Sequence, residues 1–297
     1  MKDLVVQGPQ VSSEALDTFK VVCNPERITA AAHSARCVGV RDDAETRKAV
    51  AGLASYWKLD AAFVDPAATL TDYRLLALDM DSTLINIESL DEVAAYAGKG
   101  EEVAAITEAA MSGEIADYKD SLRRRVAMLA GTDVALLARV LDEKLELNAG
   151  ARELVAACRR AGLKTLLVTG GAAFFTERLR ERLGIDYTRS NEIEVVNGRL
   201  TGRVTGPQGG EIIDADGKAR ALSDACGQIG CSTGRAIAIG DGANDLKMMK
   251  LAGLSVAYRA KPIVQQQATY ALNYARLDGI LNWFAASPAA VNQPSAG

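Results

Sequence analysis

Side chains that could hold a metal ion and a phosphate group follow three apolar segments of the sequence. Each segment has the short, continuous hydrophobic pattern of a strand buried on both faces of a parallel sheet. The polar residues behind these segments are Asp79 and Asp81 after the first, Thr169, Gly170 and Gly171 after the second, and Asp241, Asn244 and Asp245 after the third. Parallel strands would bring all three groups to one edge of the sheet, where ligands bind in open α/β folds.

The three groups are chemically complementary. Carboxylates gathered in one pocket repel one another unless a cation neutralises them, and Mg²⁺ suits oxygen ligands of this kind. Gly170 and Gly171 allow backbone N–H groups to approach an anion, and a following helix adds the positive end of its dipole. Each group alone has another interpretation: Asp79 and Ser82 could cap a turn, the glycines could form a tight turn, and Asp245 could cap a helix. Their joint occurrence favours a site for Mg²⁺ and phosphate.

The elements that must position these residues alternate between strand and helix. Strands are expected at 75–78, 164–168, 236–239 and 254–257, and helices at 149–160, 174–183, 218–229 and 245–251. Asn197-Gly198 is a two-residue hairpin signal between two further strands. Repeated β–α units predict an α/β fold with a Rossmann-like, doubly wound parallel sheet and helices on both of its faces.

The predicted core spans 71–86 and 148–285, and a helical segment interrupts it. Residues 87–147 alternate apolar and charged side chains at helical period. Ser89 and Glu92 have the spacing of a capping box, which predicts the start of a helix there. We therefore expect an all-helical cap inserted after the first strand of the core, in a position to act as a lid.

Two further segments lie outside the core and the cap. Residues 1–70 carry alternating strand and helix signals and are expected to form a small α/β unit, in which 28–40 is one apolar segment. Residues 286–297 are rich in Pro, Ala and Ser and are expected to be a flexible tail.

Composition excludes several classes of function. The 297 residues carry a formal charge of −4 and a pI near 5.3, which argues against a general nucleic-acid binder and against binding to anionic membranes. No run approaches the about 18 to 20 apolar residues of a membrane span, and the N-terminal segment lacks a signal-peptide core, so a cytoplasmic location is expected. The five cysteines are scattered and contain no CxxC pair, which indicates neither a disulfide framework nor a zinc site.

The combination of DMDST, VTGG, a downstream lysine and GDGAND resembles the four motifs of the haloacid-dehalogenase-like (HAD) phosphohydrolases over residues 72–285. The resemblance implies that Asp79 is a nucleophile that forms an aspartyl-phosphate and that Asp81 is the general acid and base. It also implies binding residues for three groups. Phosphate is bound by Thr169, Gly170 and Asn244 with support from Gly171, Mg²⁺ is bound by Asp79, Asp241 and the backbone carbonyl of Asp81, and Lys218 offsets the phosphoryl charge. Asp245 supports the site by holding the lysine or metal-bound waters. Lys218 is expected just before a helix.

Within this family, the cap resembles that of the phosphoserine phosphatases. The similarity covers Glu88, the segment 110–114 with Met111, and the segment 121–126. It implies that Glu88 receives a substrate ammonium group and that Arg125 receives a carboxylate through a planar, two-point contact. Tyr118 and Arg125 are seven residues apart, so they would share one face of a helix and point toward the site.

The resemblance therefore implies a Mg²⁺-dependent phosphatase that hydrolyses O-phospho-L-serine in serine biosynthesis. A small phosphorylated amino acid is the expected partner, neither nucleic acid nor membrane is expected, and a homodimer is left open. Two alternatives remain: a phosphotransferase or phosphatase for another small phosphorylated metabolite, and a non-catalytic regulatory binding protein. Residues 1–70 lack the full six-element pattern of a regulatory amino-acid-binding domain attached to some relatives, which implies a shortened version of that domain.

Overall fold

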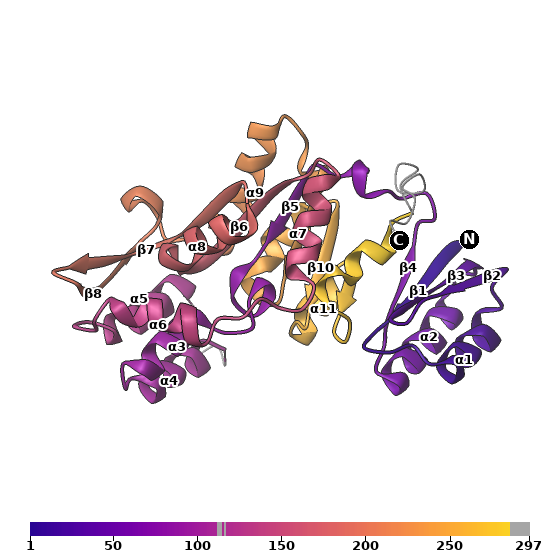
Figure 1. The fold of residues 1–297 in the computed structure, drawn as a ribbon, viewed down its shortest axis with the longest axis horizontal. Helices are drawn as coiled ribbons and strands as arrows, with labels where there is room; N and C mark the ends of the chain where they lie inside the picture. The colour runs from indigo at the N-terminus through magenta and orange to yellow at the C-terminus, as the bar shows by residue number, and fades with distance from the viewer. Residues whose placement is uncertain (112–114, 116, 286–297) are drawn as a thin grey trace, which may run out of the picture.

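The computed structural model describes residues 1–111, 115 and 117–285 of the chain, which has an elongated shape (Figure 1). A large sheet with flanking helices lies in the middle. The helical insert lies at one end of the molecule, and a smaller α/β unit, the N-terminal unit of residues 1–70, lies at the other. The tail predicted at 286–297 falls outside the described residues.

The large sheet consists, in the described chain, of β5 (Leu75–Leu78), β6 (Lys164–Ala172), β7 (Tyr187–Val196), β8 (Arg199–Thr205), β9 (Ala236–Gly240), β10 (Leu254–Tyr258) and β11 (Tyr270–Leu272). Their order is β11-β10-β9-β5-β6-β7-β8, and only β7 and β8 pair antiparallel. The chain builds outward from β5 in both directions, so the boundary between β5 and β9 is the switch point at which open α/β sheets bind ligands.

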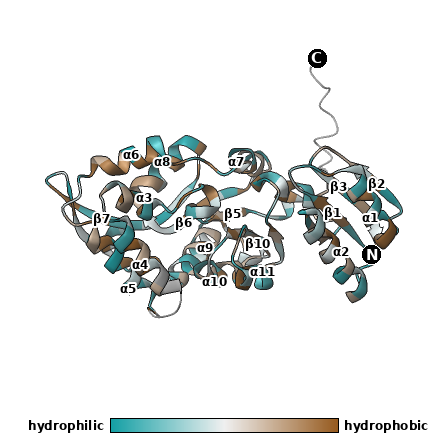
Figure 2. Ribbon diagram, turned by 90° about the horizontal axis from the view of Figure 1, so that it is seen from below, coloured by the Kyte–Doolittle hydropathy of each residue, from teal (hydrophilic) through white to brown (hydrophobic). Residues whose placement is uncertain are grey.

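Helices cover both faces of this sheet (Figure 2). One face carries α7 (Ala151–Arg160) and α8 (Ala173–Leu183), and the other carries α9 (Ala215–Ile229), α10 (Leu246–Leu251) and α11 (Pro262–Gln267). Strand β5 is apolar throughout because Leu76 and Leu78 enter the core beneath α7 and α8, while Leu75 and Ala77 enter the core beneath α9 and α10. The predicted doubly wound α/β fold is confirmed.

The insert contains α3 (Ser89–Tyr96), α4 (Gly100–Met111), α5 (Tyr118–Met128) and α6 (Ala135–Glu143). The regular elements described between residues 87 and 147 are all helices, as predicted, and the β7–β8 hairpin from a later part of the chain packs against them (Figure 1). The backbone N–H of Gly131 donates to the carbonyl of Leu200 at 2.8 Å, and the N–H of Leu200 donates to the carbonyl of Thr132 at 2.9 Å. Gly202 has a φ of +85°, and a Cβ there would lie 3.2 Å from the Cα of Ala127, so glycine permits this close approach.

The N-terminal unit contains β1 (Lys2–Gln7), α1 (Ser13–Cys23), β2 (Arg27–Ala30), β3 (Ser34–Val40), α2 (Ala44–Trp57) and β4 (Asp60–Val64). The expectation of one apolar segment at 28–40 is wrong, because a hairpin turn closed by the N–H of Ala31 and the carbonyl of Ser34 divides it into β2 and β3. The result is the full βαββαβ order of a ferredoxin-like unit, with the antiparallel sheet β2-β3-β1-β4. A shortened pattern is therefore not what the fold shows.

Hydrogen bonds fasten the N-terminal unit to the last part of the core. The buried carboxylate of Asp60 accepts the backbone N–H groups of Asn273, Tyr274 and Ala275 at 2.7 to 2.9 Å. Arg36 donates to the carbonyl groups of Asn282 and Phe284, which lie in and just after the 3₁₀ helix Leu277–Trp283. Among the described helices, none is both long and apolar enough to cross a membrane.

Candidate active site

Asp79 and Asp81 lie where β5 ends, in a turn that the rest of the core holds in shape. Asp79 is only 5% exposed. Ser82 adopts a φ of +55°, which is unusual for a residue other than glycine. The side-chain amide of Asn148 donates to the carbonyl groups of Thr83 and Ile85, both at 2.9 Å. These bonds give two backbone carbonyl groups of the turn a hydrogen-bond donor. Asn148, which is distant in the sequence, therefore helps to hold the turn that carries the two carboxylates.

Asp81 is held by the start of the insert. Its Oδ1 accepts the backbone N–H of Ser89 at 3.0 Å, in the first turn of α3. Burial and the nearby Glu88 raise the pKa of Asp81 to about 7. The predicted capping box is wrong: Glu88 occupies the N-cap position without a side-chain cap, and its carboxylate instead accepts the hydroxyl of Ser82 at 2.7 Å.

Lys218 joins two of the predicted acidic residues. Its Nζ lies 2.6 Å from Oδ1 of Asp79 and 2.7 Å from Oδ1 of Asp245, and the lysine is 1% exposed. Burial would lower its pKa, but Asp245 and Asp79 outweigh this effect and raise it. Burial and Asp245 raise the pKa of Asp79 well above its ordinary value, while Lys218 acts in the opposite sense. The sequence predicts Lys218 at the boundary of a helix over 218–229, whereas α9 begins earlier, at Ala215, and so includes it within its first turn.

The acidic residues after β9 complete a cluster. Carboxylate oxygens of Asp79, Asp241 and Asp245 all lie within 4.8 Å of one another. Asp241 accepts the hydroxyl of Thr83 at 3.3 Å, and burial, Asp245 and Glu88 raise its pKa to about 6. Three oxygen donors beside a single buried lysine leave an excess of negative charge, an arrangement that could hold a hard metal cation.

The second predicted loop is not a loop. Strand β6 runs through Thr169, Gly170 and Gly171 to Ala172, with an irregular register beside β7. The hydroxyl of Thr169 accepts the N–H of Gly171 at 2.9 Å. Asn191 donates to the carbonyl of Gly170 at 2.9 Å and so fixes this segment.

Tyr118 reaches this segment from the insert. A Cβ on Gly170 would lie 1.7 Å from the hydroxyl oxygen of Tyr118, so any larger residue at position 170 would require the tyrosine side chain to shift. Asn244 is half-buried in the turn after β9, next to Gly242. The side chain of Met111 and the segment 112–114 lie outside the described part of the chain.

Arg125 lies on the inner side of α5. Its side chain is 13% exposed and faces Asp91 of α3 at 3.8 Å, which is too long for a hydrogen bond. Its Nε and Oδ1 of Asp91 are both buried without a hydrogen-bond partner in the described chain. Glu88, by contrast, is exposed.

Sequence reasoning missed three residues that support this site. Asn148 and Asn191 act through carbonyl groups 63 and 21 positions away, for which no local pattern exists. Asp91 is also absent from the prediction. Its helical spacing from Glu88, three residues earlier, is the one signal that could have placed it beside the site.

A family model described as haloacid dehalogenase-like hydrolase matches residues 76–250. The chain belongs to this family. A phosphoserine phosphatase of Polaromonas sp. strain JS666 is 58% identical to this hydrolase over 216 residues, covering 73% of the chain and 92% of the relative. Among solved structures, a probable phosphoserine phosphatase from Vibrio cholerae superposes with a TM-score of 0.80 at 35% identity, covering 95% of this chain and 87% of that one. A HAD family hydrolase from Salmonella enterica superposes with a TM-score of 0.83 at 30% identity, covering 97% of this chain and 100% of that one.

The raised pKa of Asp81 predicts a pH dependence of stability in the metal-free hydrolase. Folding raises the pKa of this carboxyl to about 7. Its contribution to the unfolding free energy is fully present when the pH is below the ordinary pKa of an aspartate, and it is lost as the pH rises through 7. Relative to Asp81→Asn, the wild type should therefore lose a few kcal/mol of unfolding free energy between about pH 4.5 and 8. Urea unfolding of both proteins with a chelator measures this difference. A difference that stays constant over the range would contradict the assignment.

Proposed function

We propose that this hydrolase releases phosphate from O-phospho-L-serine, with Mg²⁺ as its cofactor and an aspartyl-phosphate as its intermediate. The observation that carries the proposal is the convergence of Asp79, Asp81 and Lys218 at the switch point of the sheet, beneath an insert that presents Arg125. The phosphoserine phosphatases reported above support the choice of substrate.

The proposed reaction begins with Asp79. Its carboxylate attacks the phosphorus atom, the bond between phosphorus and the serine oxygen breaks, and Asp81 gives its proton to that oxygen, which leaves as L-serine. A water molecule then loses a proton to Asp81 and attacks the phosphorus atom, which releases phosphate and restores Asp79. Asp81 must be protonated in the first step, and a pKa near 7 provides this form at neutral pH. Lys218 offsets the repulsion between the anionic nucleophile and the phosphoryl oxygens.

The donor set suits Mg²⁺. Asp245 uses both of its oxygens, one for Lys218 and one for the N–H of Gly242 at 3.1 Å. Asp79 and Asp241 each keep one oxygen that makes no hydrogen bond in the described chain, so these two residues would hold the ion together with the carbonyl of Asp81. Bound there, Mg²⁺ would supply charge neutralisation for the phosphoryl group.

The insert supplies the charges that an amino acid requires. Arg125 has an unpartnered buried Nε and only a loose contact with Asp91, so its guanidinium keeps donors for a substrate carboxylate. Glu88 lies beside Asp81 and could receive the ammonium group. A site with one anion and one cation at its entrance selects a zwitterionic phosphate ester over a simple one.

A substrate panel tests the proposal. Phosphate release should be fastest with O-phospho-L-serine among phosphomonoesters that include O-phospho-L-threonine, glycerol phosphate and p-nitrophenyl phosphate. It should disappear with a chelator and return with Mg²⁺. Preference for an ester without an amino-acid group would reject the proposed substrate. Binding of phosphoserine without turnover, in the presence of Mg²⁺, would favour a non-catalytic role.

Replacing Arg125 should separate substrate recognition from chemistry. Arg125→Ala should lower kcat/KM for phosphoserine by about tenfold to a hundredfold, because a charge-assisted contact to the carboxylate is lost. Hydrolysis of p-nitrophenyl phosphate, which has no carboxylate, should change far less. Arg124→Ala is the matched control, since Arg124 is exposed on the same helix and pairs with Asp120. Equal losses for both substrates would assign Arg125 to structure.

A further inference from the structure

Asp79 is almost completely covered in this arrangement of the insert. Asp79 is 5% exposed, and the hydroxyl of Tyr118 lies directly over Gly170. An approach to the site past Tyr118 therefore requires α5 to move away from the core. Contacts between α5 and the core that do not involve the catalytic residues should then set the fraction of molecules in which α5 is closed over the site.

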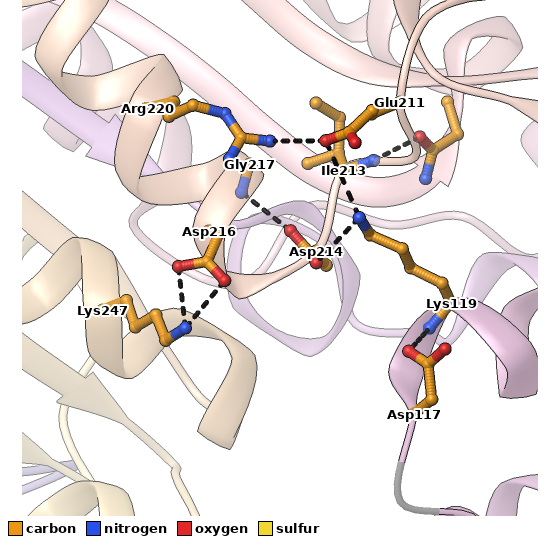
Figure 3. Close-up of polar contacts among 10 residues, drawn as sticks. Asp117, Lys119, Glu211, Ile213, Asp214, Asp216, Gly217, Arg220 and Lys247 are labelled. Carbon is orange, nitrogen blue, oxygen red and sulfur yellow. Dashed lines mark hydrogen bonds and ion pairs between the residues drawn. The ribbon is translucent and has the colours of Figure 1, made fainter.

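Lys119, the neighbour of Tyr118, makes such a contact (Figure 3). Its Nζ lies 3.4 Å from Oδ2 of Asp214 and 3.8 Å from Oε2 of Glu211. The side chains of Lys119 and Asp214 are 25% and 18% exposed, so this pair is shielded from water more than an ordinary surface pair, whereas Glu211 is exposed. The N–H of Lys119 donates to the carboxylate of Asp117 at 2.9 Å, which fixes the start of α5.

Asp214 connects this contact to the catalytic lysine. Its other oxygen, Oδ1, accepts the N–H of Gly217 at 2.8 Å and caps α9. Its backbone carbonyl accepts the N–H of Lys218 at 2.8 Å. One residue therefore touches both the first turn of α5, which covers the site, and the first turn of α9, which carries Lys218 (Figure 3).

We propose that Lys119 is a positioning residue whose ion pair with Asp214, assisted by Glu211, latches α5 closed over the site. The pair touches no reacting atom. It stabilises the closed arrangement, and it forms at the cap of the helix that carries Lys218, so closure and the placement of that lysine are coupled. The substrate affinity that the latch provides rests on the proposed function, while its effect on closure does not.

Hydrogen exchange of the substrate-free protein tests closure directly. Lys119→Met should speed backbone exchange in peptides that cover 118–122 and 169–172 by about two- to fivefold, as expected for the loss of a pair of this kind. Lys247→Met is the matched control. Lys247 also pairs with an aspartate in the first turn of α9, at 2.7 Å from Asp216, but it belongs to α10 and not to the insert. Equal exchange rates of Lys119→Met and Lys247→Met in both peptides would overturn the latch.

A double-mutant cycle separates the latch from general damage. Asp214→Asn keeps a side chain that caps helices but removes the charge. Lys119→Met and Asp214→Asn should each raise the KM for phosphoserine about two- to fivefold. The KM of the double variant should be no higher than that of either single variant. Lys119→Arg should restore the KM. Additive effects would overturn the latch, whereas absence of phosphoserine hydrolysis in the wild type would reject the proposed function and leave the exchange result to decide closure.

Discussion

The buried contact of Lys218 with Asp79 and Asp245 is the interaction on which the site depends. Removing a lysine and two carboxylates from water costs free energy. The electrostatic attraction between Lys218 and the two carboxylates, at distances of 2.6 and 2.7 Å, offsets this cost. The three residues come from α9, β5 and the turn after β9, so the contact ties both halves of the sheet together at its switch point. A cluster of this kind is weak evidence for stability, but it places the charges where a phosphoryl group would need them.

The fold explains why these groups can meet. Strands β5, β6 and β9 are adjacent and parallel, so their carboxyl ends deliver three chemically different segments to one edge. The insert begins immediately after the first of them, and its first helix donates a backbone N–H to Asp81. The insert that covers the site thus starts directly after the turn that carries Asp79 and Asp81.

The sequence predicted this core because its signals are local. The continuous apolar strands and the polar residues that follow them in the sequence are enough to predict the fold. They also predict the cluster of Asp79, Asp241 and Asp245, and neither prediction needs knowledge of contacts between distant residues. The missed features are those that depend on partners far away: Asn148 holds a turn 63 positions earlier, and the β7–β8 hairpin joins a helical insert from beyond α8. The sequence pattern predicts a start of α9 that is too late, because the helix begins at a cap in which Asp214 accepts the N–H of Gly217. The hairpin at 28–40 was missed because its turn lacks Gly, Pro and Asn.

The central claim is that Asp79 carries the phosphoryl group. Brief reaction with O-phospho-L-serine and Mg²⁺, an acid quench, and reduction with borohydride should convert the phosphorylated aspartate to homoserine, which peptide mass spectrometry can locate. The account predicts homoserine at position 79 in the wild type and none in Asp79→Asn. Rapid phosphate release without conversion at Asp79, or with conversion at another carboxylate, would contradict it.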